Sequence, residues 1–351
     1  MRAAVLYAPG DLRIEEHDSD PSGNVPGPDQ VRVRVTAGGI CGSDLHYFQH
    51  GGFGEVRIKQ PMILGHEVAG VVEQVGSRVE HVAAGDRVAL NPSRPCGRCR
   101  FCLRGMPNQC LDMLFYGSAM RTPHVHGAFR ERLLVEGFQC QPVPATVSTR
   151  AAAFAEPLSC GLHAVQRAGS VLGARVLVTG QGPIGMLAAL AARAAGAAEV
   201  VVTDIVDAPL KLARTLGADA AVNIATTPEA LEDRAADKGQ FDVLIEASGN
   251  PAAVNAALPL VRPRGVMVQL GVGGDMTLPM GVIVAKELEL RGTFRFHDEF
   301  ALAVSLIASG RVDVMPLLTE VVPLDEAQRA FELASDRNRA MKVQLALGDE
   351  G

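Results

Sequence analysis

Hydrophobic and polar residues alternate along the first third of the chain with the period of a β-strand. Residues 30–35 place an apolar side chain at every second position, as expected of a strand with one buried face. Residues 67–75 and 86–90 have a similar composition. Because turns rich in Gly and Pro separate these short segments, the pattern predicts a β-rich, barrel-like domain.

The pattern changes near residue 150, where apolar strands begin to alternate with helices. The predicted strands are 176–179, 199–204, 241–245 and 266–270, and the predicted helices are 183–195, 210–216 and 254–260. Such alternation predicts a parallel sheet with helices on both faces. The remaining expected elements are two amphipathic helices and a strand, at 300–308, 325–334 and 342–347.

Composition and charge narrow the class of protein. The chain has 351 residues, 48% of them hydrophobic, which is a globular composition. A chain of this length exceeds what a single hydrophobic core usually supports, so two domains are expected. The net charge of −6 and the lack of a basic run argue against nucleic acid as a partner. The sequence indicates neither a signal peptide nor a membrane-spanning segment. We therefore expect a soluble, cytoplasmic protein.

Four of the seven cysteines, Cys96, Cys99, Cys102 and Cys110, lie within fifteen residues. An odd number of cysteines in a chain without a signal peptide argues against a disulfide framework. Four thiolates at this spacing can surround one Zn²⁺ and leave no open position, so a structural zinc site is predicted in the lobe 94–112. An iron–sulfur cluster, which also takes four cysteines, is the alternative.

A second group of possible metal ligands is dispersed along the chain. Cys41 and His66 lie in the β-rich part, and Glu156 lies where that part ends. Each of these residues alone is more typical of a structural position, since a lone Cys is often a small buried residue. Together, in this order and with the four-cysteine lobe between them, they indicate a catalytic metal site.

This combination resembles the zinc-containing medium-chain dehydrogenases, in particular their sorbitol dehydrogenase branch. The resemblance covers essentially the whole chain. It implies an α/β fold made of two domains: a GroES-like, β-rich catalytic domain formed by residues 1–153 and 297–351, and a Rossmann nucleotide-binding domain formed by residues 154–296.

The resemblance also assigns catalytic roles. Cys41 and His66 are expected to bind a catalytic zinc, with Glu156 as the third ligand and Glu67 as the alternative. Three protein ligands leave a position for substrate, where zinc acts as a Lewis acid toward a hydroxyl group.

Three polar residues near Cys41 complete this expected site. Asp44 is expected to orient His66. Ser43 resembles the hydroxyl residue that takes the alcohol proton, and His46 is expected to pass that proton to solvent. An exposed histidine without a catalytic role is the alternative for His46.

A glycine-rich turn between a strand and a helix predicts a dinucleotide site. The motif Gly180-Gln181-Gly182-Pro183-Ile184-Gly185 allows close approach of a pyrophosphate to a helix N-terminus. Asp204 ends the next strand, 19 residues after Gly185, where an acid binds the ribose hydroxyls. Ile205 and Val206 follow Asp204 directly, with no Arg there to bind a 2′-phosphate, so NAD is expected rather than NADP. Further cofactor contacts are expected from Ala247, Ser248, Leu270, Val272, Phe294 and Arg295.

Local similarity narrows the expected substrate. The stretches that are closest to the L-idonate-oxidising members of this branch are 39–47, 62–67, 91–96, 117–120 and 292–296. The resemblance therefore implies an aldonate, L-idonate first, that is oxidised at C5. Polyols such as sorbitol and xylitol are the alternative.

The expected substrate-binding residues are Arg295 and Tyr47, since a carboxylate gains from a cation. Arg121, His124 and His126 lie on a loop that could reach the substrate, although a solvated loop is the more common environment for such residues. Two zinc ions and NAD are the expected cofactors of each chain. Family analogy implies a homodimer or homotetramer.

Overall fold

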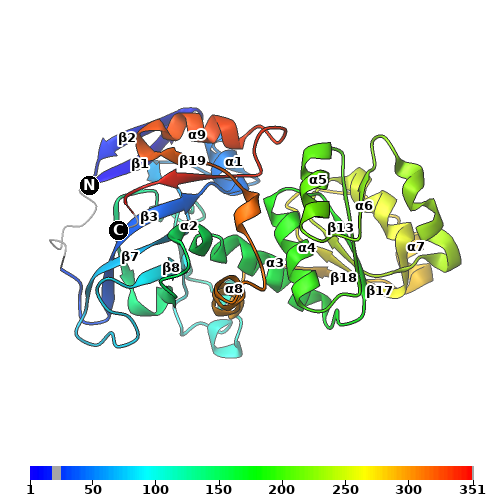
Figure 1. The fold of residues 1–351 in the computed structure, drawn as a ribbon, viewed down its shortest axis with the longest axis horizontal. Coiled ribbons are helices and arrows are strands. Elements are labelled where there is room, and N and C mark those ends of the chain that lie inside the picture. The colour runs from blue at the N-terminus through cyan, green and yellow to red at the C-terminus, as the bar shows by residue number, and fades with distance from the viewer. Residues whose placement is uncertain (18–24, 350–351) are drawn as a thin grey trace. The chain divides into compact units, whose positions relative to one another are not determined.

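The computed structural model describes residues 1–17 and 25–349. The chain forms two compact units (Figure 1): unit 1 is Met1–Glu156 with Phe300–Gly351, and unit 2 is Pro157–Glu299. Each passage between the units lies at a helix, the first within α3 (Ala155–Ala168) and the second at the start of α8 (Glu299–Ala308). Within the described ranges, no helix combines the length and the apolar character needed to cross a membrane.

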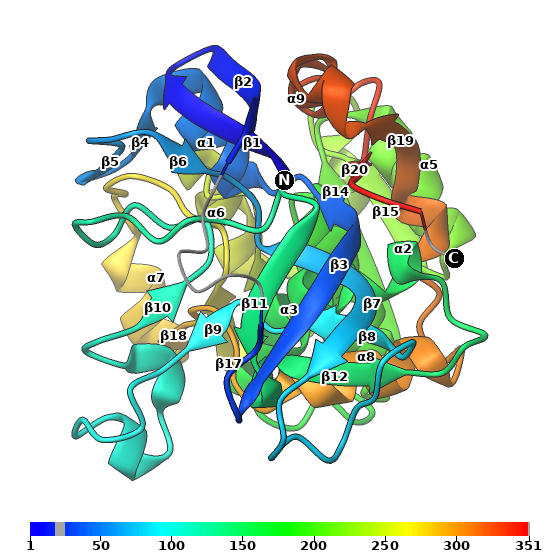
Figure 2. The same ribbon diagram turned by 90° about the vertical axis from the view of Figure 1, so that its left-hand side faces the viewer.

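Unit 1 is built around a seven-stranded sheet, ordered β12-β8-β7-β3-β20-β19 with β11 paired to β3 (Figure 2). The strands of this sheet are β3 (Gln30–Gly39), β7 (Glu67–Val75), β8 (Arg87–Leu90), β11 (Arg132–Glu136), β12 (Cys140–Val143), β19 (Leu318–Pro323) and β20 (Lys342–Ala346). The other strands and α-helices of unit 1, besides most of α8, are β1 (Arg2–Ala8), β2 (Asp11–Glu16), α1 (Gly42–His50), β4 (Gly52–Phe53), β5 (Val56–Arg57), β6 (Met62–Ile63), β9 (Ser93–Arg94), β10 (Leu114–Phe115), α2 (Thr149–Ala152) and α9 (Ala327–Ala334).

The central strand β3 organises this unit. Its alternating residues Val31, Val33 and Val35 are fully buried, as the period-two pattern predicts. Gly39, the last residue of β3, is paired with Glu67 of β7 on one side and with Gln344 of β20 on the other. The end of β3 therefore lies beside the starts of β7 and β20.

Unit 2 contains a six-stranded parallel sheet, ordered β15-β14-β13-β16-β17-β18. Its strands are β13 (Arg175–Thr179), β14 (Glu199–Asp204), β15 (Ala220–Asn223), β16 (Phe241–Glu246), β17 (Val261–Gln269) and β18 (Glu289–Gly292). Its helices, besides most of α3, are α4 (Pro183–Ala194), α5 (Asp207–Thr215), α6 (Pro251–Ala257), α7 (Met280–Lys286) and the 3-10 segment η4 (Pro228–Lys238). The strand order reverses between β13 and β16, as in a Rossmann fold.

The ends of one helix, α6, differ from those predicted by the sequence pattern because capping and a proline determine them. The predicted helix 254–260 begins earlier, at Pro251, because the Asn250 side chain accepts a hydrogen bond from the Ala252 N–H. It ends earlier as well, since residues Leu258–Leu260, which include a proline, form a 3-10 turn. Helices α1 and α3 were not predicted from the pattern.

Candidate metal and nucleotide sites

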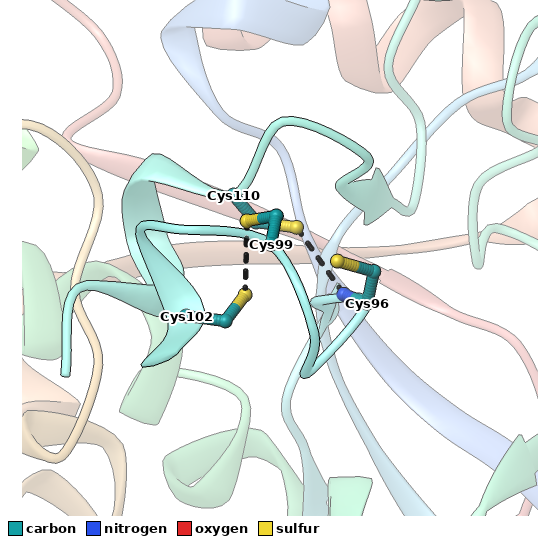
Figure 3. Close-up of side chains that lie close together, drawn as sticks. All are labelled: Cys96, Cys99, Cys102 and Cys110. Atoms are coloured by element: carbon teal, nitrogen blue, oxygen red, sulfur yellow. Dashed lines mark hydrogen bonds between the residues drawn. The ribbon is translucent and has the colours of Figure 1, made fainter. Parts of the chain in front are cut away.

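Four cysteines lie together on a loop of unit 1 between the paired strands β9 and β10. Their sulfur atoms all lie within 4.8 Å of one another, and Figure 3 shows them turned inward from different parts of the loop. The Sγ atoms of Cys99 and Cys102 are 3.5 Å apart, and the Cys96 N–H donates a hydrogen bond to Cys110 Sγ at 3.2 Å. The structure thus brings together the four cysteines that the sequence grouped.

This cluster fits a closed metal site. Between residues 95 and 113, all of them described, only Pro107 is buried, so the loop has almost no hydrophobic core of its own. Hydrogen bonds from the main chain at Cys102 and Leu111 lower the pKa of the Cys99 thiol to about 6, whereas burial raises that of Cys102 to about 12. A divalent cation would favour all four thiolates and would stabilise the loop.

A second cluster lies where β3, β7 and β20 meet. Cys41 follows β3 and is the N-cap of α1, while His66 and Glu67 lie at the start of β7. One possible ligand atom from each of these three residues lies within 4.8 Å of the other two. Asp44 connects the segments, because its Oδ2 accepts a hydrogen bond from the Cys41 N–H at 3.0 Å and its Oδ1 accepts one from the Gly65 N–H at 3.1 Å.

The His66 ring has an unused nitrogen. This side chain is buried, and its Nδ1 has no hydrogen-bond partner among the described residues. Asp44 Oδ1 lies 3.7 Å from that nitrogen, which is too long for a hydrogen bond but close enough for a charge interaction. An unpaired imidazole nitrogen beside a thiol and a carboxylate matches the donor set of a transition metal.

A buried lysine that the sequence pattern does not predict belongs to this cluster. Lys342 begins β20, is 2% exposed, and donates hydrogen bonds to both oxygens of Glu67, at 2.8 and 2.7 Å, and to the Ile40 carbonyl at 3.1 Å. A Cβ at Gly39 would lie 2.2 Å from Glu67 Oε2, so the glycine leaves room for this carboxylate. The only signal in the sequence is a charged residue at the start of a last strand that carries no other charge.

Glu156, the expected third ligand, is not among the residues gathered within 4.8 Å. It lies in the first turn of α3 and is buried. The pKa of Glu156 is raised to about 8, mainly by burial. His66 opposes this rise, whereas the negative charges of Glu67 and Cys41 contribute to it. Glu156 is therefore close enough to interact electrostatically with the cluster.

The charges of this cluster also suit a divalent cation. Burial raises the pKa of the Cys41 thiol to about 12. When ionised, Cys41, Glu67 and Glu156 carry three negative charges, and Lys342 carries one positive charge. The difference of two is the charge that Zn²⁺ would balance, whereas Asp44 is separately stabilised by two main-chain hydrogen bonds.

Helix α1 carries the other residues expected near the substrate. Ser43 is half-buried and His46 is exposed, and their spacing of three places them on the same side of the helix. Burial and the neighbouring His50 lower the pKa of His46. Tyr47 is 2% exposed and its hydroxyl accepts a hydrogen bond from the Ala119 N–H at 3.1 Å, so Tyr47 holds the adjoining loop in place.

The residues of that loop are occupied by contacts within unit 1. Arg121 forms an ion pair with Asp112 at 2.6 Å. His124 and His126 each accept a hydrogen bond from a main-chain N–H, at 2.8 and 3.2 Å. Burial lowers the pKa of His126 to about 4. These contacts favour a structural role for the three side chains.

In unit 2 the glycine-rich turn joins β13 to α4. Gly180 has a φ of 82°, and a Cβ there would lie 2.7 Å from the Ser248 main chain. A Cβ at Gly185 would lie 1.8 Å from the Gly180 carbonyl oxygen, whereas a Cβ at Gly182 would meet nothing within 4 Å. Because Gly182 is the N-cap of α4, the turn leaves open space for an anionic ligand at a helix N-terminus.

Asp204 lies beside this turn, at the end of β14. Its Oδ2 accepts a hydrogen bond from the Gln181 N–H at 2.6 Å, and its Oδ1 accepts one from the Ile205 N–H at 2.7 Å. The carboxylate is buried, while the Ile205 side chain is 61% exposed. The structure therefore brings the acid and the glycine-rich turn together, and binding of a ribose there stays a prediction.

The remaining residues expected at the cofactor follow the ends of the neighbouring strands. Arg295 has a φ of 54°, which is uncommon for a residue other than glycine, and its guanidinium lies 4.9 Å from the centre of the Phe294 ring. The other members of this set follow β16 or β17 and are Ala247, Ser248, Leu270 and Val272.

Comparison with known proteins places this chain in a family. Residues 27–145 match the profile of the alcohol dehydrogenase GroES-like domain, and residues 183–309 match that of the zinc-binding dehydrogenases. L-Idonate 5-dehydrogenase (NAD(P)(+)) of Escherichia coli is 47% identical over 314 residues, which are 89% of this chain and 90% of that protein. This chain belongs to the zinc-binding medium-chain dehydrogenases.

One further relative and one solved structure cover nearly the whole of this dehydrogenase. Human sorbitol dehydrogenase is 39% identical over 347 residues, 97% of this chain and 94% of that protein. The crystal structure of L-idonate 5-dehydrogenase from Escherichia coli superposes with a TM-score of 0.93 and 43% identity, covering 98% of this chain and 97% of the other. The predicted fold class, enzyme class and cofactors, zinc and a nicotinamide dinucleotide, are therefore confirmed at the level of the family.

Proposed function

We propose that this dehydrogenase oxidises the C5 hydroxyl of an aldonate, L-idonate first, and transfers the hydride to NAD. The supporting observation is the 47% identity over 89% of the chain to an L-idonate 5-dehydrogenase, compared with 39% for human sorbitol dehydrogenase. A polyol is the second candidate substrate, because the similarity to sorbitol dehydrogenase extends over 97% of the chain.

Cys41, His66 and Glu156 would hold the catalytic zinc. When bound, the zinc supplies Lewis-acid catalysis, which makes the substrate hydroxyl more acidic. Ser43 accepts the hydroxyl proton as it gives up its own, and the exposed His46, one helical turn further along α1, transfers a proton to solvent.

The contacts of Lys342 support Glu156 over Glu67 as the third ligand. Both oxygens of Glu67 accept hydrogen bonds from the Lys342 ammonium. By contrast, no ion pair involves the Glu156 carboxylate within the described part of the chain. Glu67 acts in this proposal as a charged neighbour of the metal ligands, held in place by Lys342.

The other two sites are assigned in the same way. Cys96, Cys99, Cys102 and Cys110 would hold a second, structural zinc ion. The turn that contains Gly182 would receive the pyrophosphate of the cofactor, and Asp204 would accept hydrogen bonds from its ribose. The negative charge of Asp204 disfavours a 2′-phosphate, so NAD is the proposed cofactor.

Arg295 is the proposed partner of the substrate carboxylate, and a substrate panel tests the assignment. L-Idonate should exceed sorbitol and xylitol in kcat/KM by roughly tenfold or more, the value of one charge-assisted hydrogen bond. Arg295→Lys should lose much of this preference, because Lys cannot form a bidentate contact. Higher activity on sorbitol or xylitol would make the enzyme a polyol dehydrogenase instead.

We also propose that the enzyme is a homo-oligomer. Helix α7 of unit 2 exposes two large apolar side chains one turn apart, Val284 at 71% and Met280 at 59%, and neighbouring exposed apolar side chains are typical of interface surfaces. Size-exclusion chromatography with light scattering should give a multiple of the chain mass, and a monomer at micromolar concentration would contradict this proposal.

A further inference from the structure

Glu246 is a buried carboxylate of unit 2 that the proposed mechanism does not use. It is the last residue of β16 and is fully buried. The partners of this carboxylate in the described part of the chain are all neutral donors, and none is a Lys, Arg or His side chain. Because burying a carboxylate without a cationic partner is unfavourable, a functional role is expected for Glu246.

The donors come from three neighbouring strands. Oε1 accepts hydrogen bonds from the Thr179 hydroxyl at 3.3 Å, at the end of β13, and from the N–H at 2.8 Å and the hydroxyl of Ser248. Oε2 accepts them from the Gly249 N–H at 3.0 Å and from Gln269 Nε2 at 2.5 Å, at the end of β17. Gln269 also donates to the Gly271 carbonyl at 2.8 Å. One carboxylate therefore joins the carboxyl ends of β13, β16 and β17.

The loops that follow these strands are in direct main-chain contact. A Cβ at Gly180 would lie 2.7 Å from Ser248 Cα. A Cβ at Gly271 would lie 2.2 Å from the Gly249 nitrogen, and one at Gly273 would lie 2.3 Å from the Gly249 oxygen. The sheet order reverses between β13 and β16, which is where open parallel sheets bind their ligands. These loops therefore lie against the glycine-rich turn, at the edge of the sheet where a nucleotide is expected to bind.

The charge of Glu246 matters in addition to its hydrogen bonds. Burying a carboxylate is unfavourable unless donors stabilise it, and an amide here would turn N–H groups toward other donors. The nicotinamide ring is positively charged in NAD and neutral in NADH. A fixed negative charge beneath the nucleotide site therefore interacts more favourably with the oxidised cofactor.

We propose that Glu246 is a positioning residue of the nucleotide site, which holds these three loops together and favours the oxidised over the reduced cofactor. The inference rests on the proposed binding of NAD at the glycine-rich turn. Two variants separate its two parts: Glu246→Gln removes the charge, whereas Gln269→Ala keeps the charge and removes one connection between the loops.

The experiment measures the dissociation constants of NAD and NADH by calorimetry. In Glu246→Gln, the affinity for NAD should fall roughly tenfold more than that for NADH. In Gln269→Ala, both affinities should fall by a similar factor. Asp242→Asn is the matched control, because Asp242 is the second residue of the same strand and accepts hydrogen bonds from the Arg175 N–H at 2.8 Å and from Arg262 at 2.6 Å, away from the loops. Both affinities should stay unchanged in this variant.

The outcomes distinguish this inference from the proposed function. A wild-type protein that binds neither NAD nor NADH would overturn the proposed function. Equal losses of NAD and NADH affinity in Glu246→Gln would overturn the role of the charge, and unchanged affinities in Gln269→Ala would overturn the positioning role. If Glu246→Gln does not fold, Glu246→Asp replaces it: the charge is kept, so the ratio of the two affinities should match wild type, and a changed ratio would contradict the inference.

Discussion

The Lys342–Glu67 ion pair can be opened by one substitution, Lys342→Met. The ammonium and the carboxylate are 2.7 Å apart, and their side chains are 2% and 1% exposed. Methionine retains most of the aliphatic volume but removes the charge and the hydrogen bonds to Glu67 and to the Ile40 carbonyl. Glu67 then remains as a buried carboxylate without its cation.

The expected loss of stability is large because the pair is buried. Removing one partner of a buried ion pair costs about 3–5 kcal/mol of unfolding free energy. For a folding unit of this size, that corresponds to a fall in Tm of roughly 6–20 °C. A bound zinc ion would partly replace the missing positive charge, so the loss should be greater after chelation than before.

Urea unfolding of the zinc-loaded and chelated proteins, followed by circular dichroism, measures both losses. The control is Arg329→Met, because Arg329 is 48% exposed in its pairs with Glu320 and Glu326 and should lose less than about 1 kcal/mol. The double variant Glu67→Gln/Lys342→Met should regain stability over Lys342→Met, since no unpaired charge remains. If Lys342→Met is as stable as the wild type with and without zinc, the argument from burial is refuted.

The two groups of expected metal ligands and the glycine-rich turn lead to three more predictions. Elemental analysis should find two zinc ions per wild-type chain and one in Cys99→Ser. The cysteine loop of this variant should become sensitive to proteases, because metal binding contributes to its folding. Iron in the wild type would contradict the zinc assignment. Glu156→Gln should lower kcat at least roughly tenfold and lose zinc faster to a chelator, with NADH affinity unchanged; full activity with both zinc ions retained would make Glu67 the third ligand. The wild type should prefer NAD over NADP by at least about tenfold in kcat/KM, and Asp204→Ala should narrow that ratio by raising activity with NADP; equal use of both cofactors by the wild type would rule out the proposed role of Asp204.

Local sequence determined the features that depend on short spacing. The four cysteines span fifteen residues and the glycine-rich motif spans six, so chain connectivity alone keeps each group together. The segments 67–75 and 199–204 coincide with β7 and β14, because their runs of apolar and β-branched residues are typical of strands buried in a sheet. Capping residues such as Asn250 shifted the ends of helices without changing the predicted fold class.

Only the tertiary structure decided which distant segments meet. Lys342 contacts Glu67, 275 positions earlier in the chain, because β20 and β7 lie on either side of β3. Glu246 contacts Thr179 and Gln269 because the sheet places β16 between β13 and β17. The order of strands in a sheet results from long-range packing. A local pattern therefore could not reveal that Lys342 neutralises Glu67 beside the expected zinc ligands. Nor could it reveal that Glu246 joins the loops that follow β13, β16 and β17.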